Sequence, residues 1–81
     1  MQITVHFLAS LRHTTKTREW ALDVPAGATL QSVIHSVLVQ YPDLAGQEAM
    51  WHLAINSTHA DDDAVLQPGD RVSIFPYIGG G

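Results

Sequence analysis

The sequence contains no cysteine and only one lysine. The missing cysteines exclude disulfide bonds, thiolate ligands for a metal ion and a cysteine nucleophile. Lysine and arginine together number 4, against 8 aspartate and glutamate residues, which gives a formal net charge of -4. Because nucleic-acid binding depends on neutralising phosphates, this charge argues against nucleic acid and favours a partner protein with a basic face.

Long apolar runs are also missing from the sequence. No segment approaches the ~20 apolar residues that a membrane helix needs, and the start of the chain does not have the pattern of a signal sequence. A length of 81 residues with 46% hydrophobic content fits one small domain that buries roughly 60% of its unfolded surface. We therefore expect a single cytoplasmic domain that does not associate with a membrane.

Hydrophobic periodicity predicts two strands and a helix in the first half of the chain. Apolar and polar residues alternate at 1–8 and again at 19–24, which is typical of half-buried strands. Between 30 and 41 the apolar residues recur at helical spacing, with Thr29 as a capping residue before them and Pro42 after them. This segment is predicted to be the main helix.

The second half of the sequence is less regular. Residues 43–50 fit neither periodicity, 53–55 indicate a short strand, and L-Q-P-G-D at 66–70 is a turn that leads into a last strand through Val72 and Ile74. The order strand, strand, helix, strand, strand predicts a two-layer α+β domain in which the helix covers a mixed sheet. If the last strand pairs with the first in parallel, the first strand is central, as in a β-grasp fold.

The last strand is expected to present different residues on its two faces. If Val72 and Ile74 point into the core, alternation places Phe75 on the other face, together with Tyr77 if the strand continues past Pro76. These aromatic side chains either cover an edge of the sheet or form a docking surface for a partner. The sequence leaves both interpretations open.

The chain ends in three glycines at 79–81. Because Pro76 has no N–H to donate, we expect a domain at 1–75 and a flexible tail at 76–81 that spans about 20 Å when extended. Glycines can enter a channel too narrow for side chains and deliver the terminal carboxylate to another protein. That carboxylate is ionised at neutral pH and needs a leaving group before acyl transfer. The sequence has no phosphate-binding G-x-x-x-x-G-K-[ST] loop, so a partner must supply the activation.

Four segments, taken in order, resemble the ubiquitin-like sulfur carriers. They are F-L-A-S-L-R at 7–12, A-I-N at 54–56, L-Q-P-G-D-R-V at 66–72 and F-P-Y-I-G-G-G at 75–81. Within this family the chain is most similar to the small subunit of molybdopterin synthase (MoaD), and the thiamine-pathway carrier (ThiS) is a relative. The resemblance implies a ubiquitin-like β-grasp fold, with one main helix packed across a mixed sheet.

The resemblance also implies a reaction at the C-terminus. An adenylating enzyme of the MoeB/ThiF type uses ATP and magnesium to form an acyl-adenylate at Gly81, and a sulfur donor converts it to a thiocarboxylate. In molybdopterin synthase the tail enters the large subunit (MoaE type) within a heterotetramer, and the sulfur is used to build molybdopterin for the molybdenum cofactor. The carrier binds no cofactor of its own. The absence of cysteine agrees with sulfur carried only on the backbone terminus.

Individual positions match the family's functional residues. Gly81 corresponds to the site of the acyl-adenylate and the thiocarboxylate. The resemblance assigns partner binding to the residues Arg12, Phe75, Pro76, Tyr77, Ile78, Gly79 and Gly80. The sequence departs from the family in two places. H-T-T-K at 13–16 replaces the acidic residue and glycine that often follow the arginine, and Tyr77 replaces the more usual second proline.

Other functions use the same kind of terminus. The chain could supply sulfur to another pathway, such as thiamine thiazole synthesis, or act as a ubiquitin-like modifier that is joined to lysine through Gly81. A β-grasp interaction module with a frayed end is a third alternative. The five histidines lack a close metal-ligand spacing, and the acidic run at 61–63 lacks the remaining residues of a calcium loop. We expect no metal site and no independent enzyme activity.

Overall fold

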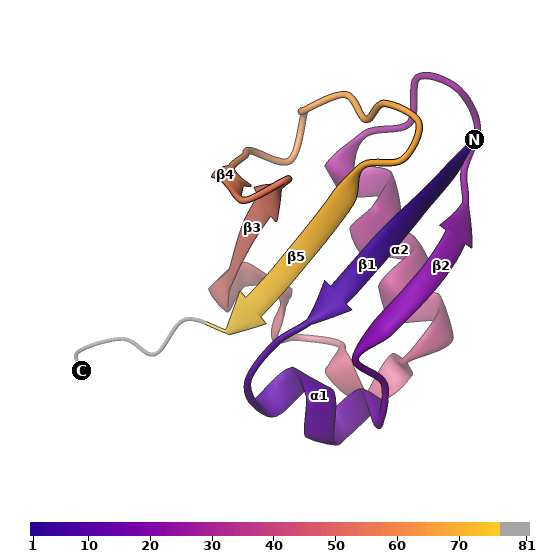
Figure 1. Ribbon diagram of the computed structural model, residues 1–81. Coiled ribbons are helices and arrows are strands. Elements are labelled where there is room, and N and C mark those ends of the chain that lie inside the picture. The colour runs from indigo at the N-terminus through magenta and orange to yellow at the C-terminus, as the bar shows by residue number, and fades with distance from the viewer. Residues whose placement is uncertain (77–81) are drawn as a thin grey trace.

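Five strands form one mixed sheet (Figure 1). The computed structural model describes residues 1–76. The strands are β1 (Gln2–Phe7), β2 (Glu19–Asp23), β3 (Trp51–Ile55), β4 (Thr58–His59) and β5 (Arg71–Pro76). Their order in the sheet is β2-β1-β5-β3-β4. The pair β1–β5 is parallel and the other neighbouring pairs are antiparallel, so the predicted parallel pairing of the first and last strands is confirmed.

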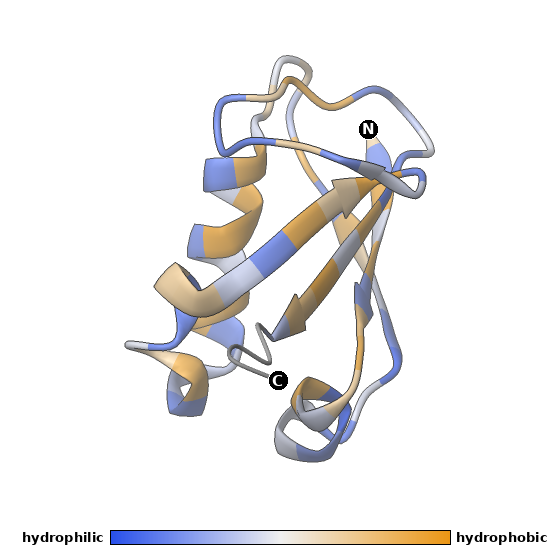
Figure 2. Cartoon of the chain, turned by 90° about the vertical axis from the view of Figure 1, so that its left-hand side faces the viewer, coloured by the Kyte–Doolittle hydropathy of each residue, from blue (hydrophilic) through white to orange (hydrophobic). Residues whose placement is uncertain are grey.

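The helix α2 (Leu30–Gln40) lies across one face of this sheet. Its start is closed by a capping box, in which the Ser32 N–H donates to Thr29 Oγ1 at 3.3 Å and the Thr29 N–H donates to Ser32 Oγ at 3.2 Å. Figure 2 shows that the hydrophilic segments of α2 lie on its side away from the sheet. The predicted helix and its cap are confirmed. No helix within residues 1–76 is long and apolar enough to cross a membrane.

The core lies between α2 and the sheet. Alternate residues of three strands turn toward the helix and are buried, namely Ile3, Val5, Phe7, Leu53, Val72 and Ile74. The helix contributes the buried residues Leu30, Val33 and Val37. At one edge Phe7 and Trp20 both contact Tyr41 edge-on, with ring centroids 5.3 and 5.6 Å away. This two-layer α+β arrangement is the predicted ubiquitin-like β-grasp fold.

The sequence pattern does not predict several short elements. These are α1 (Ser10–Thr15), the 3-10 helices η1 (Pro42–Leu44) and η2 (Glu48–Met50), and β4. Each is too short to show a periodic pattern. α1 lies between the first two predicted strands, where the sequence shows no regular alternation. Its buried residues Leu11 and Thr15 fix α1 against the domain.

The position of β1 also differs in part from the prediction. β1 is an interior strand, but the middle of the sheet is occupied by β5, because β3 and β4 extend the sheet on the far side. A turn at Asn56 and Ser57, with φ values of 51° and 71°, folds the chain back to form β4. Two consecutive positive φ values match the twist of a two-residue hairpin.

Candidate functional site

The candidate site is the end of the sheet at which β5 reaches Pro76. β1 ends here and β3 begins here, because β1 is parallel and β3 antiparallel to β5. The Leu8 N–H donates to the carbonyl oxygen of Ile74 at 3.1 Å, and Trp51 stands opposite Pro76 in the ladder. Figure 1 shows α1 at the same end of the molecule. Two neighbouring strands therefore fix the last described residue of β5.

Phe75 lies on the sheet face opposite the core. Its neighbour Ile74 is fully buried, whereas Phe75 is half-buried. His52 is the cross-strand partner of Phe75 and stacks on it, with ring centroids 5.4 Å apart and an interplanar angle of 20°. The predicted orientation of Phe75 is confirmed. An aromatic pair on the face that α2 leaves uncovered is suited to contact with a partner protein.

Pro76 is the end of β5 and also the first residue of the range expected as a tail. It donates no backbone hydrogen bond to a neighbouring strand. Trp51, its cross-strand partner, has a buried Nε1–H with no acceptor among residues 1–76. The other predicted site residues lie outside the described part of the chain, namely Tyr77, Ile78, Gly79, Gly80 and Gly81.

The helix α1 places Arg12 at the same end of the sheet as Phe75. The helix follows a tight turn in which the Leu11 N–H donates to the Leu8 carbonyl oxygen at 3.1 Å and Ala9 has a φ of 52°. A positive φ in a residue with a Cβ atom is strained. α1 contacts both β1 and β5, and Arg12 is exposed. The structure therefore brings three of the residues named by the family resemblance, Arg12, Phe75 and Pro76, to one region.

Three further residues at this end are absent from the set predicted from sequence. Leu8, which follows β1, is 37% exposed, and Met50, which precedes β3, is 56% exposed. The third is His52, which is half-buried. Its position opposite Phe75 depends on the register of two strands that are far apart in sequence, so no local pattern identifies it.

Asn56 and Asp70 join two of the segments that carry the family resemblance. Asn56 Nδ2 donates to Asp70 Oδ1 at 2.9 Å, and the Arg71 N–H donates to Asn56 Oδ1 at 2.9 Å. The other carboxylate oxygen of Asp70 accepts the Gln67 N–H at 2.8 Å. Asn56 follows the last residue of β3, so this network lies at the opposite end of the strand from His52. These two segments stabilise the fold and do not belong to the candidate site.

The histidines do not gather into a metal centre. His52 and His59 have ring centroids 6.5 Å apart, and His6 Nε2 is 3.5 Å from the carboxylate of Glu19. Within residues 1–76 there is no group of three or more side chains that could hold a metal ion. The acidic residues at 61–63 are exposed in the loop before β5.

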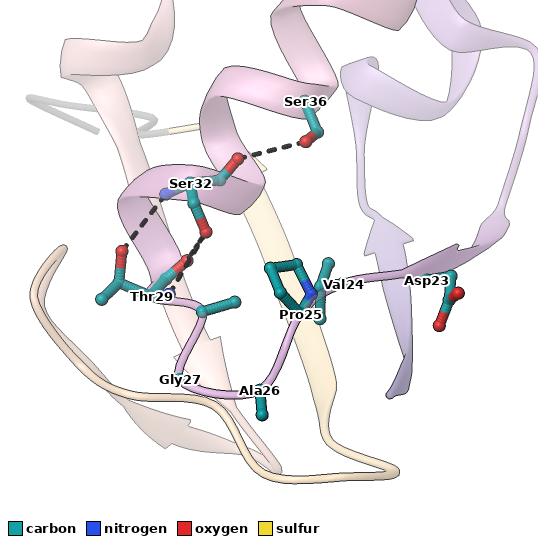
Figure 3. Close-up of a pocket in the computed structure, with 9 residues that line it drawn as sticks. Asp23, Val24, Pro25, Ala26, Gly27, Thr29, Ser32 and Ser36 are labelled. Atoms are coloured by element: carbon teal, nitrogen blue, oxygen red, sulfur yellow. Dashed lines mark hydrogen bonds between the residues drawn. The ribbon is translucent and has the colours of Figure 1, made fainter.

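A hollow of about 320 Å³ lies at the other end of the molecule, beside the start of α2 (Figure 3). Residues 23–29 line it together with Ser32 and Ser36. The hydroxyl groups there are used within the helix, because Ser32 Oγ donates to the Thr29 carbonyl oxygen at 2.6 Å and Ser36 Oγ donates to the Ser32 carbonyl oxygen at 3.2 Å. The one ionisable side chain among these residues is Asp23, and its carboxylate lies 3.4 Å from the N-terminal ammonium group of Met1.

Comparisons with known proteins agree with this geometry. The ThiS family model matches residues 5–81. A molybdopterin synthase sulfur carrier subunit from Arabidopsis thaliana is 30% identical over 81 residues, which cover 100% of this chain and 84% of the plant protein. The crystal structure of SAMP1 from Haloferax volcanii has a TM-score of 0.89 at 19% identity, with 100% of both chains covered. The complex of subunits 1 and 2 of molybdopterin-converting factor from Helicobacter pylori contains a chain that matches with a TM-score of 0.68 at 21% identity, again over 100% of both chains.

The family model and the plant relative both extend over the C-terminal glycines, and the SAMP1 structure matches the fold over the whole chain. Sequence and fold therefore lead to the same assignment. The chain belongs to the ThiS family and is a small ubiquitin-like protein of the MoaD sulfur-carrier type.

Proposed function

We propose that this protein carries sulfur as a thiocarboxylate on Gly81 and donates it for molybdopterin biosynthesis. The observation that carries the proposal is the likeness to a molybdopterin synthase sulfur carrier subunit over all 81 residues. The Gly-Gly terminus supplies the group to be modified. The candidate site supplies the surface beside it.

The chemistry begins at an unreactive carboxylate. The Gly81 carboxylate attacks the α-phosphorus of ATP in the adenylating partner, pyrophosphate leaves, and magnesium in that partner offsets the phosphate charge. A sulfur nucleophile from the donor then attacks the acyl carbon and displaces AMP. If that sulfur is the outer atom of a persulfide, a second thiol attacks the donor's sulfur in the resulting acyl disulfide, which releases the thiocarboxylate and leaves a disulfide on the donor. The thiocarboxylate sulfur is a better nucleophile than the original carboxylate oxygen.

The residues of this chain act by binding and positioning. The pairing of β5 with β1 and β3 holds Phe75 and Pro76 at a fixed place on the sheet. The stacked pair of Phe75 and His52 forms a flat contact area, and Leu8 adds exposed apolar surface near the end of β1. A partner that binds this surface holds the final residues at its own active site. The carrier therefore needs no catalytic group of its own.

The molybdopterin assignment names two partners, an adenylating enzyme of the MoeB type and a large synthase subunit of the MoaE type. The complex from Helicobacter pylori supports the second partner, because a chain with this fold is assembled there with another subunit of molybdopterin-converting factor. We propose the corresponding heterotetramer, with two small and two large subunits, for this protein.

A second candidate function is protein modification through an isopeptide bond at Gly81. It is favoured by the likeness in fold to SAMP1, a protein described as a small archaeal modifier. Adenylation is shared by the two functions, and only the acceptor differs. A carrier for another sulfur-transfer pathway, such as thiamine thiazole synthesis, would also share this first step.

Mass spectrometry of the C-terminal fragment tests the proposal. The full chain is incubated with extract from its host, ATP and a sulfur source, and then digested. The fragment is needed because methionine oxidation gives nearly the same mass change as replacing oxygen by sulfur, and Met1 and Met50 can both oxidise. Sulfur on Gly81, released when a large synthase subunit and pterin precursor are added, is the expected result.

Three other outcomes contradict the proposal. An unmodified terminus with ATP-dependent conjugates to lysine would identify a modifier. Neither product, in an extract that thiolates a known carrier, would show that the glycines have no role in transfer. A thiocarboxylate that persists with the large synthase subunit but is consumed by thiazole synthesis would redirect the protein to the thiamine pathway.

A further inference from the structure

The cations of this acidic protein are concentrated in one place. Of its 4 lysine and arginine residues, Arg12, Lys16 and Arg18 lie within a short segment, and Arg71 is the fourth. All three side chains of the segment are exposed. We call Arg12, Lys16 and Arg18 the α1 basic cluster. It is an exception to the overall negative charge and is not explained by the fold.

The local structure directs this cluster outward. Arg12 lies within α1, and Lys16 is the residue that ends the helix, with a left-handed backbone at a φ of 56°. Their neighbours Leu11 and Thr15 are buried. Thr15 Oγ1 donates to the Leu11 carbonyl oxygen at 2.9 Å and accepts the Thr17 N–H at 3.2 Å. These bonds order the turn, so the cluster is presented by defined backbone.

The charges of the cluster are not neutralised within the described chain. Among residues 1–76 neither Arg12, Lys16 nor Arg18 forms a salt bridge. The acidic residue nearest in sequence, Glu19, has its carboxylate 3.5 Å from His6. Unpaired cations cost little in water and attract an oppositely charged surface over about 10 Å at ordinary salt concentration.

The cluster is close to the candidate site. α1 contacts β5 and the end of β1, and the Phe7 N–H donates to the Arg18 carbonyl oxygen at 2.9 Å. A protein that binds at the end of β5 therefore lies beside α1. The family resemblance already assigns a partner role to Arg12, but it offers no counterpart for Lys16 or Arg18.

We propose that the α1 basic cluster docks onto an acidic patch of the adenylating partner, beside the channel that admits the tail. The inference rests on the proposed function and adds the chemistry of the partner's surface. The net charge of -4 favours a partner with a basic face. The α1 basic cluster, by contrast, favours an acidic surface on the partner. The cluster also sets orientation, because an acidic partner surface is attracted to this end and repelled by the exposed acidic loop at 61–63.

Binding measurements on the full chain test this inference. The charge-reversal variant K16E/R18E is compared with the wild type for affinity to the purified adenylating enzyme of the same host, at about 50 mM and about 500 mM NaCl. We expect at least a tenfold loss of affinity at low salt, and a smaller difference at high salt because the charges are screened. The variant Lys16→Arg keeps the charge and should bind as the wild type does.

Arg71 provides the matched control. It is exposed and carries the same charge, but it stands at the start of β5, away from the candidate site. Arg71→Glu should change the affinity by less than about twofold. Thermal melting of all variants should be nearly unchanged, since each altered side chain is exposed.

Three results would overturn the inference. They are wild-type affinity in K16E/R18E, an equal loss in Arg71→Glu, and no binding of the wild type to the enzyme at either salt concentration. If the first result were accompanied by a loss of binding to a single-stranded RNA oligonucleotide, the cluster would be a nucleic-acid contact. The proposed function is judged separately by the mass of the C-terminal fragment. Sulfur on Gly81 together with unchanged enzyme affinity would leave the function standing and remove only this inference.

Discussion

Adjacent residues of β5 have opposite roles. Ile74 points into the core and is fully buried, whereas Phe75 points to the other face and stacks on His52. This alternation follows from the two-residue period of a strand. Removing the Ile74 side chain should therefore affect stability, whereas removing the Phe75 side chain should affect partner binding.

Phe75→Ala should weaken partner binding more than it lowers stability. The change removes an aromatic pair worth about 1 kcal/mol beyond the area that it buries, from a half-buried position. Affinity for the adenylating enzyme or the large synthase subunit should fall by about tenfold or more, because aromatic residues dominate protein interfaces. Isothermal titration and chemical denaturation measure the two effects.

Ile74→Ala is the control for this prediction. It leaves a cavity in the core and should lower the free energy of unfolding by about 2–5 kcal/mol. If Phe75→Ala caused a loss of that size and bound its partners normally, Phe75 would be a structural residue that covers the sheet.

At the scale of elements, short segments are held by side-chain hydrogen bonds as much as by burial. The β3–β4 turn is tied to the start of β5 by Asn56, which bonds both Asp70 and the backbone of Arg71. This connection fixes the start of β5, the strand that carries Phe75 near its other end. The family segments at 54–56 and 66–72 therefore stabilise the strand that bears part of the candidate site.

Asn56→Ala should destabilise the protein by about 2 kcal/mol, because two hydrogen bonds are lost and Asp70 loses a donor in a buried position. Asparagine also tolerates the positive φ of this position better than alanine does. The free energy of unfolding from urea titration gives the measurement.

Ser57→Ala is the matched control. Ser57 has a positive φ like Asn56, but its side chain makes no hydrogen bond among residues 1–76. This substitution should lower the free energy of unfolding by less than about 0.5 kcal/mol. Equal losses in the two variants would attribute the effect to the turn backbone.

At the level of the whole molecule, the buried core cluster within residues 1–76 extends from Ile3 to Ile74. The sheet and α2 form this stable body. The proposed reaction takes place at Gly81, which lies outside the described residues.

Deletion of Gly80 and Gly81, or addition of residues after Gly81, should leave the melting temperature within about 2 °C of the wild type, because the core is unchanged. The same changes should abolish thiocarboxylate formation, since the reacting carboxylate is removed or displaced. Differential scanning calorimetry and mass spectrometry of the C-terminal fragment measure both properties. Normal sulfur transfer by an extended chain that stays uncleaved would disprove the role of the terminus.

Much of the fold follows from local patterns. The alternation at the two ends of the chain gives β1 and β5, and the helical spacing with Thr29 before it gives α2 and its cap. α1 and β4 escape prediction because they are short and depend on contacts with the rest of the domain. At the candidate site, Arg12 and Phe75 follow from the sequence, whereas Leu8 and His52 do not, because strand pairing places them there.

The fold class, the core face of β5 and the chemistry available at a C-terminal carboxylate follow from local patterns, because periodicity and residue type are local properties. The position of β5 in the middle of the sheet and the stacking of His52 on Phe75 are visible only in the folded protein. Folding also places α1, with the exposed Arg12, against β5. These relations join residues that are far apart in sequence. They depend on strand order and register, which are settled by the packing of the whole chain.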